Sequence, residues 1–287
     1  MGGLMRFVPE IRPLTIRGHT LVSLVAGNPQ HPAIIMVHGW CHHPAVWLAT
    51  MEALHTTHYC VAVGVLGFGE SAKPRDGDYG ILAHGEDVLA IADTLGLARF
   101  ILIGQSRGGQ IALALSGGLA PDRVIKLVDI SGVVTGHLSW YMRTCMTLPI
   151  WLGAQHPAWY TLFRQLASVP SLATLYYRPY MDDPRRFAVD FAQREILQAL
   201  QPAAHYSNYA CMQSMRATNV LPYLAQIRAP TLILFGKHDG VVPVAQGYLA
   251  AQHIPQAHLV VLDDCGHYPM FEQPTAYLSH LRTFLAA

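Results

Sequence analysis

The sequence predicts an α/β fold in which a mostly parallel β-sheet carries helices on both faces. Short apolar runs alternate along the chain with segments of helix length. Most of these runs are apolar at consecutive positions, as strands of a parallel sheet are when both of their faces are buried. Apolar residues make up 52% of the chain and charged residues 13%. Disorder is therefore excluded as the main state, because it requires low hydrophobicity and high charge.

The strands are expected where apolar, often β-branched runs lie between turn-forming residues. The first run, residues 21–25, is expected in an antiparallel meander at the edge of the sheet. The other expected strands are residues 33–37, 59–63, 100–103, 124–130, 231–235 and 259–262. The helices expected between them are residues 81–95, 108–119, 244–252 and 275–285. This alternation indicates a parallel sheet with helices on both faces.

The alternation stops over residues 136–216, which are rich in Trp, Tyr, Met and Pro and contain no convincing strand. We expect a helical cap (lid) there, inserted into a core domain made of residues 1–135 and 217–287. An ordinary set of core helices is the alternative. The aromatic side chains suit an apolar ligand pocket, although aromatic residues also pack well in any core.

An uncharged stretch, residues 144–163, raises the question of a membrane span. A spanning helix needs about 20 predominantly apolar residues. The interruptions here are Pro149, Gly153, Gln155, His156 and Pro157. We therefore expect no integral membrane segment, and expect the stretch to be buried against the body or to line a pocket. A peripheral membrane role is the alternative.

Charge and cysteine content exclude several classes of protein. The formal net charge is +1, so the overall charge gives no electrostatic basis for binding nucleic acid or acidic membranes. The five cysteines are scattered and form no C-x-x-C pair, which argues against a disulfide framework or a structural zinc site. A reducing, cytoplasmic location is expected. No compact metal-ligand set, Walker motif or G-x-G-x-x-G motif occurs, so no metal or cofactor is expected. The oligomeric state cannot be read from the sequence.

A candidate nucleophile lies in residues 104–108, Gly-Gln-Ser-Arg-Gly, which match G-x-S-x-G. An expected strand ends just before this motif and an expected helix begins at Gly108. A nucleophilic serine must stand on a sharp strand-to-helix turn, and glycines two residues away on each side avoid clashes there. The helix N-terminus favours developing negative charge. Ser106 is the predicted nucleophile.

A serine nucleophile needs a base and an orienting acid. His267 lies in the loop between the last expected strand and the last helix, where it can reach over the strand ends and take the Ser106 proton. Asp239 follows the strand at residues 231–235 and can accept the histidine N–H. Asp129, near the end of the strand at residues 124–130, is the alternative acid.

An oxyanion hole is expected from two backbone N–H groups, those of Trp40 and Arg107. Trp40 follows His38 and Gly39 after the strand at residues 33–37. His38 is expected to brace this loop through a hydrogen bond, with a catalytic role as the alternative. The Arg107 side chain either contacts a substrate carboxylate or lies in solvent as a surface charge.

Together these motifs resemble the α/β-hydrolase superfamily over essentially the full length of the chain. The order Ser106, Asp239, His267 is the order of that superfamily. The matching segments are residues 38–40, 67–69, 104–109, 236–239 and 266–267. The resemblance implies an eight-stranded, mostly parallel sheet with a helical cap inserted after the sixth strand. It also implies a serine hydrolase, because related dehalogenases and epoxide hydrolases carry Asp at the position of Ser106.

The predicted function is therefore a carboxylesterase-like serine hydrolase that cleaves an ester of a small to medium apolar substrate through an acyl-enzyme. Residues 264–267 also resemble the histidine loop of carbon–carbon bond hydrolases that act on ring-cleavage products. Residues 38–42 resemble a loop of the cofactor-independent dioxygenases of 4-oxoquinoline breakdown, whose orienting acid falls at the position of Asp129. That family carries His where this chain has Arg107. A binding module built on a hydrolase fold is the remaining alternative.

Overall fold

The computed structural model describes residues 7–183 and 201–287. Its centre is one eight-stranded sheet with the strand order β1-β2-β4-β3-β5-β6-β7-β8. The strands are β1 (Glu10–Ile16), β2 (His19–Ala26), β3 (Ala33–Val37), β4 (Tyr59–Val63), β5 (Phe100–Gln105), β6 (Val124–Ile130), β7 (Thr231–Gly236) and β8 (Ala257–Leu262). The β1–β2 and β2–β4 pairs are antiparallel and all the others are parallel. The predicted eight-stranded, mostly parallel sheet is confirmed.

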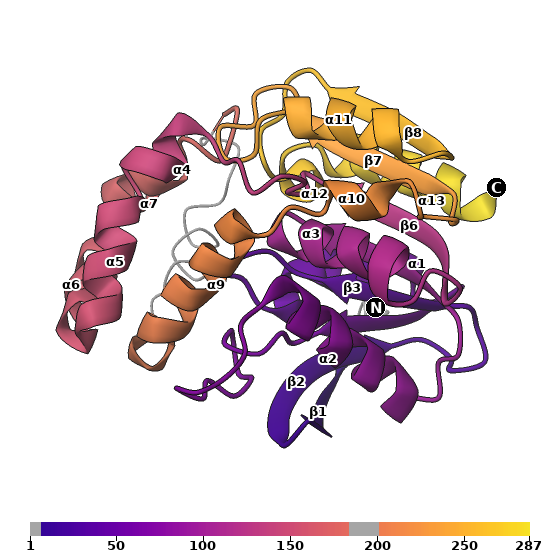
Figure 1. Cartoon of the computed structure of the whole chain (residues 1–287), viewed down its shortest axis with the longest axis horizontal. Coiled ribbons are helices and arrows are strands. Elements are labelled where there is room, and N and C mark those ends of the chain that lie inside the picture. Colours follow the sequence, from indigo (N-terminus) through magenta and orange to yellow (C-terminus); the bar gives the residue numbers. More distant parts are fainter. Residues whose placement is uncertain (1–6, 184–200) are drawn as a thin grey trace, which may run out of the picture.

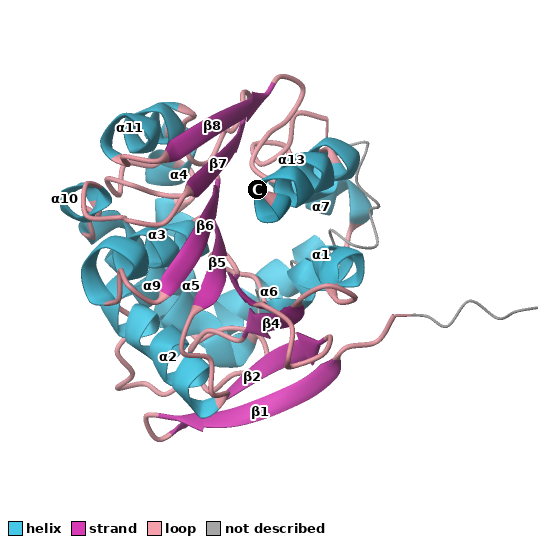
Figure 2. Cartoon of the chain, turned by 90° about the vertical axis from the view of Figure 1, so that its right-hand side faces the viewer, coloured by secondary structure: helices cyan, strands magenta, loops and turns pink. Residues whose placement is uncertain are grey.

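Helices cover both faces of this sheet (Figure 2). On one face lie α2 (Ile81–Thr94), α3 (Arg107–Ala114) and α11 (Ala245–His253); on the other lie α1 (Leu48–Leu54) and α13 (Pro274–Ala286). Four short elements complete the described core: η1 (Pro44–Trp47), η2 (Leu115–Leu119), α10 (Leu221–Leu224) and α12 (Pro269–Glu272). The expected helix at residues 108–119 therefore ends its α-helical part at Ala114 and continues as a single wider turn, η2.

Burial explains which strands the sequence predicted well. Every residue of β3, β4, β5 and β7 is buried, because helices cover both sides of these central strands. The edge strand β1 was not predicted. Its burial pattern has exposed side chains on one face, so it carries no continuous apolar run. The antiparallel meander expected around residues 21–25 is the β1–β2 pair.

The segment between β6 and β7 forms helices on one side of the sheet (Figure 1). They are α4 (Trp140–Thr144), α5 (Thr147–Gln155), α6 (Pro157–Ala167), α7 (Pro170–Tyr177), η4 (Pro202–Ala204) and α9 (His205–Ala217). No strand occurs among the described residues of this segment. Residues 184–200 lie outside the described residues. The division into a core and a cap at residues 136 and 216 stays a prediction, and α9 ends one residue beyond the second boundary.

One prediction about this segment was wrong. The uncharged stretch at residues 144–163 was expected to be buried against the body or to line a pocket, but four of its large apolar side chains are exposed, those of Leu148, Trp151, Trp159 and Leu162. Only one side of α5 and one side of α6 pack against other parts of the protein, through buried residues such as Ile150 and Tyr160. None of the helices in the described ranges is both long and apolar enough to cross a membrane.

The five cysteines all lie within the described residues, and no disulfide joins them. The reducing location expected from their spacing stays a prediction.

We predict that the strand-to-helix turn after β5 tolerates no side chain at Gly104. A Cβ there would collide with the carbonyl oxygen of Gly108 and lie 2.8 Å from the Cβ of Ala112. Gly104→Ala should lower the free energy of unfolding by about 3 kcal/mol, because the clash is with backbone and cannot relax through a rotamer. Urea unfolding monitored by circular dichroism measures the change.

Gly96→Ala is the matched control. Gly96 has a φ of +71°, and an added Cβ would meet no atom within 4 Å. Gly96→Ala should lower the free energy of unfolding by only about 1 kcal/mol, the cost of placing alanine in a left-handed backbone conformation. Equal losses in the two variants would contradict the packing explanation for Gly104.

Candidate active site

The turn between β5 and α3 holds Ser106 in a strained conformation. Ser106 has a φ of +56°, in the left-handed region that non-glycine residues rarely adopt. Its N–H donates to the carbonyl of Ile130 at 2.8 Å, and its own carbonyl accepts from the N–H groups of Gln110 and Val133. These hydrogen bonds fix the turn to α3, to β6 and to the loop that follows β6. Strain of this kind persists only where surrounding structure imposes it, and it is concentrated at functional sites.

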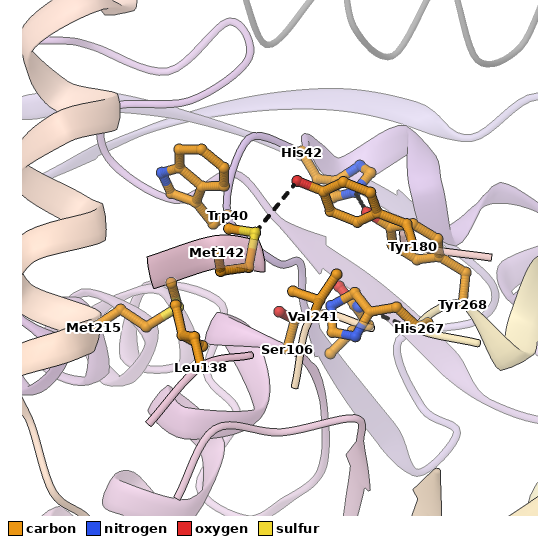
Figure 3. A pocket seen from close by; sticks show the side chains of 11 residues that line it. Trp40, His42, Ser106, Leu138, Met142, Tyr180, Met215, Val241, His267 and Tyr268 are labelled. Atoms are coloured by element: carbon orange, nitrogen blue, oxygen red, sulfur yellow. Dashed lines mark hydrogen bonds between the residues drawn. The ribbon is translucent and has the colours of Figure 1, made fainter. Parts of the chain in front are cut away.

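His267 and Asp239 meet across 28 residues of sequence. The Nδ1 atom of His267 lies 2.7 Å from Oδ2 of Asp239, and both side chains are almost fully buried. The other carboxylate oxygen, Oδ1, accepts from the N–H groups of Val241 and Val242 at 2.9 and 2.8 Å. The carboxylate is therefore fixed, and it favours the His267 tautomer with the proton on Nδ1. Nε2 is then able to accept a proton from Ser106, which lies beside the ring (Figure 3).

The loop that carries His267 is anchored by groups that the sequence interpretation missed. Glu272 is the main anchor, because its carboxylate accepts from the N–H groups of Gly266 and Tyr268. Burial raises the pKa of Glu272, and these backbone donors oppose that rise. The N–H of His267 donates to the carbonyl of Tyr180 at 2.7 Å. The only sequence signal for Glu272 was an acidic residue five positions after the histidine, at the end of the short helix α12.

The loop after β3 lies directly against the nucleophile turn. A Cβ at Gly39 would be 3.1 Å from the Cβ of Ser106. Trp40 follows Gly39 in this loop and Arg107 follows Ser106 in the turn, and the role of their backbone N–H groups as oxyanion donors stays a proposal. The indole of Trp40 donates to the carbonyl of Asn208 in α9 at 2.8 Å, which fixes its ring.

His38 occupies a bracing position in this loop. Its Nε2 accepts from the N–H of Val65 at 3.4 Å, so Nδ1 carries the proton and donates to the carbonyl of Gly39 at 2.9 Å. Burial lowers the pKa of His38 to about 3, and the ring is therefore neutral. This geometry matches the expected loop brace.

The Arg107 side chain does not lie in solvent, so that expectation was wrong. It is 1% exposed. Its guanidinium donates to the carbonyl of Tyr79 and to Nδ1 of His84, both at 2.8 Å, and to the hydroxyl of Ser214 at 3.4 Å. These partners are all neutral, and none of them lines the pocket that holds Ser106. Arg107 thus ties α3 to α2 and α9, and it does not line the site where a substrate carboxylate would bind.

Asp129 does not contact His267. Its carboxylate is fully buried, and neither oxygen has a hydrogen-bond partner in the described part of the chain. It lies against the backbone of Gly109 and Gly132, where a Cβ would clash with it. Burial raises the pKa of Asp129 to about 7. The geometry therefore brings Asp239, and not the alternative acid Asp129, to the histidine.

A narrow pocket lies at Ser106 (Figure 3). Its free volume is about 20 Å³, which is room for about one water molecule, so the surrounding side chains must move apart to admit a substrate. The residues that line it are Trp40, His42, Gln105, Ser106, Leu138, Met142, Tyr180, Met215, Val241, His267 and Tyr268. None of them carries a permanent charge. The 136–216 segment supplies Leu138, Met142, Tyr180 and Met215.

The sequence interpretation also missed a polar pair in the pocket wall. Nε2 of His42 lies 2.9 Å from the hydroxyl of Tyr268. The position of Tyr268, directly after His267, was the only signal for it. Within the described ranges, no three His, Cys, Asp or Glu side chains gather as a metal ion requires.

Residues 32–274 match the family model described as alpha/beta hydrolase fold, and the chain therefore belongs to this family. It is 28% identical over 254 residues to a pimeloyl-[acyl-carrier protein] methyl ester esterase of Nitrosomonas europaea. The alignment covers 86% of this chain and 93% of that protein. The chain is 29% identical over 239 residues to a 2-hydroxymuconate semialdehyde hydrolase of Pseudomonas putida. This alignment covers 80% of this chain and 78% of that protein.

Solved structures show the same fold. The esterase RhEst1 of a Rhodococcus species superposes with a TM-score of 0.80 at 24% identity, over 96% of this chain and 98% of that one. The relatives of this chain thus include esterases and other hydrolases.

We predict that Asp129 makes the protein less stable as the pH rises. Its pKa in the folded state, about 7, lies above the ordinary value of 3.8, so the folded protein holds this proton more tightly than the unfolded chain does. Stability is then lost as the pH rises from about 4 to about 7, by roughly 4 kcal/mol in total for this one group. Asp129→Asn should abolish that loss.

Urea unfolding at pH 5 and pH 8 measures the difference. The variant should gain stability over the natural protein at pH 8 and much less at pH 5. Asp122→Asn, at an exposed carboxyl paired with Arg228, is the control and should show no such pH dependence. An unchanged pH profile in Asp129→Asn would contradict the interpretation of a protonated, buried carboxyl.

Proposed function

We propose that this protein is a serine hydrolase that cleaves a carboxylic ester of a small to medium apolar substrate through an acyl-enzyme. One observation carries the proposal: Ser106 stands on a strained strand-to-helix turn beside His267, whose Nδ1 is bonded to Asp239 at 2.7 Å. A buried, oriented histidine next to a serine at such a turn is the arrangement that activates a hydroxyl as a nucleophile.

In the proposed reaction, Oγ of Ser106 attacks the ester carbonyl while Nε2 of His267 takes its proton. The N–H groups of Trp40 and Arg107 stabilise the negative oxygen of the tetrahedral intermediate. The intermediate collapses, the carbon–oxygen bond to the alcohol breaks, and His267 returns the proton to the alcohol. Water, deprotonated by His267, then attacks the acyl carbon. The bond between that carbon and Oγ of Ser106 breaks, the acid leaves, and His267 returns the proton to Ser106. Asp239 holds the imidazole in place and stabilises its charged form.

The character of the pocket supports an apolar substrate. Its described lining is uncharged and includes Met142, Tyr180 and Met215. A substrate with a carboxylate, as ring-cleavage products have, would bring a charge into this lining without a described cation to pair with. The methyl ester esterase among the relatives also favours ester hydrolysis. The similarity to 2-hydroxymuconate semialdehyde hydrolase keeps carbon–carbon bond hydrolysis as the second candidate.

The dioxygenase alternative receives less support, because it relies on an acid at the position of Asp129. That carboxylate has no hydrogen bond to His267. The hydrolytic proposal instead uses Asp239, whose two oxygens are both engaged in the geometry described above.

We predict that a small organophosphonate forms one covalent adduct with the protein, on Ser106. Intact and peptide mass spectrometry of the natural protein, Ser106→Ala and His267→Ala measures this. Ser106→Ala should show no adduct, and His267→Ala should react at least about 100-fold more slowly because the general base is lost. A panel of esters of varied chain length then defines the substrate. No adduct on folded natural protein would overturn the proposal, and oxygen uptake with hydroxyquinolines would be the next test.

A second prediction separates the two candidate acids. Asp239→Asn should lower kcat by about 10⁴-fold, because an amide favours the wrong histidine tautomer while keeping the shape of the site. Asp129→Asn is the matched control and should leave kcat within a few-fold of the natural protein. A large loss of kcat in Asp129→Asn with little change in Asp239→Asn would reverse the assignment.

A further inference from the structure

The helices α4 to α7 expose an unusual concentration of apolar side chains. Of the fourteen large apolar residues that are exposed in the described part of the chain, nine lie between Trp140 and Leu175. Trp140 is 67% exposed, Leu175 61% and Leu148 59%. Isolated exposed apolar residues need no explanation, but a contiguous set indicates an interaction surface. We call the exposed apolar residues of α4 to α7 the outer helical face.

Their spacing shows that these residues form stripes. In α5, Leu148 and Trp151 are three residues apart; in α6, Trp159 and Leu162 have the same spacing. Residues three or four apart lie on the same side of a helix. Each helix therefore packs one side inward and turns a second apolar side outward, where a surface helix normally carries polar residues. Figure 1 shows α5 and α6 at the edge of the molecule, with α9 between them and the sheet.

The charge of this segment has one sign. No Asp or Glu occurs between Asp129 and Asp182, whereas Arg143, Arg164 and Arg178 do. Arg143 and Arg178 are exposed. Tryptophan and leucine combined with arginine are typical of segments that lie in the interface of a membrane, and arginine attracts anionic lipid headgroups. A second copy of the chain fits this face less well, because it would bring arginines together with no carboxylate from this segment to pair with them.

The outer helical face and the pocket are bordered by the same two chain segments. A surface hollow on it is lined by Tyr141, Leu172, Leu175, Arg178 and Pro179. Tyr141 precedes Met142 in the chain, and Pro179 precedes Tyr180; Met142 and Tyr180 both line the pocket above Ser106. The hydroxyl of Tyr180 lies 3.8 Å from Sδ of Met142 (Figure 3). The two chain segments that border the hollow thus also border the pocket.

We propose that the outer helical face docks on a lipid surface that carries anionic headgroups. Its leucine and tryptophan side chains enter the boundary between headgroups and acyl chains, and Arg143 and Arg178 bind phosphate groups at the surface. The pocket then faces an apolar phase, and its substrate is an ester that partitions into that phase. This last point rests on the proposed ester hydrolysis, but the docking itself does not.

Docking is tested with the full-length Ser106→Ala protein, so that no lipid is hydrolysed. Co-sedimentation is measured with vesicles of phosphatidylcholine alone and of phosphatidylcholine mixed with phosphatidylglycerol. We expect binding to the mixed vesicles, weaker binding at high salt, and still weaker binding to phosphatidylcholine alone. Adding Trp140→Ser, Trp151→Ser and Leu175→Ser should reduce binding at least about tenfold, because three large apolar groups no longer leave water.

The control carries the same kind of change on other surfaces. Ile11 and Tyr248 are 68% and 51% exposed and lie outside the outer helical face. Ile11→Ser with Tyr248→Ser should leave vesicle binding unchanged. Circular dichroism confirms that each variant folds, and Arg143→Glu with Arg178→Glu should remove the preference for phosphatidylglycerol.

Three results would overturn the proposal. The first is no binding to either vesicle by folded protein. The second is binding that the triple substitution leaves unchanged. The third is that light scattering detects a dimer, that the triple substitution dissociates it, and that no vesicle binding occurs. The outer helical face would then be a contact between two copies of the chain.

Ester hydrolysis is then compared for a dissolved short ester and for an ester carried in vesicles. For this comparison the triple substitution is made with Ser106 intact. Loss of only the vesicle-borne activity then supports the substrate class, whereas absence of both activities in the natural protein rejects ester hydrolysis and leaves the docking result standing.

Discussion

The left-handed backbone at Ser106 is the constraint on which the rest of the site depends. A turn this tight requires the neighbouring chain to approach closely, so Gly104 and Gly108 have no room for side chains. Hydrogen bonds from Ser106 to Ile130 and from Val133 to Ser106 hold the turn from the neighbouring strand β6 and the loop that follows it. The strain is thus maintained by the sheet. The loops after β3, β7 and β8, which carry Trp40, Asp239 and His267, are arranged around this fixed turn.

The helical segment between β6 and β7 takes part in the site in three ways. Its side chains, Met142, Tyr180 and Met215, form much of the pocket wall. The carbonyl of Tyr180 also accepts the N–H of His267, so the same segment helps to hold the candidate base. Arg107 adds a third connection, through Ser214 in α9, to the residue that follows Ser106. A change in the position of these helices would therefore reach both the pocket and the histidine loop.

Two buried ionisable groups lie close to the nucleophile turn without a partner of opposite charge in the described residues. Arg107 donates only to neutral acceptors, and Asp129 has no hydrogen-bond partner there. Burial of a charge without a counter-charge is costly. Asp129 lowers this cost by holding its proton, as its raised pKa indicates. Arginine does not lose its proton in proteins, so Arg107 relies on its hydrogen bonds alone.

The sequence by itself determined the sheet, the turn at Ser106 and the candidate groups His267 and Asp239. These features have local causes: burial on both faces produces apolar runs, and a strained turn demands glycine at fixed offsets. Tertiary structure alone decided which acid meets His267, where the Arg107 side chain lies, and that Glu272 anchors the histidine loop. It also decided that the apolar helices α5 and α6 face outward. Each of these depends on how segments far apart in the chain are placed relative to one another, and local composition carries no record of that placement.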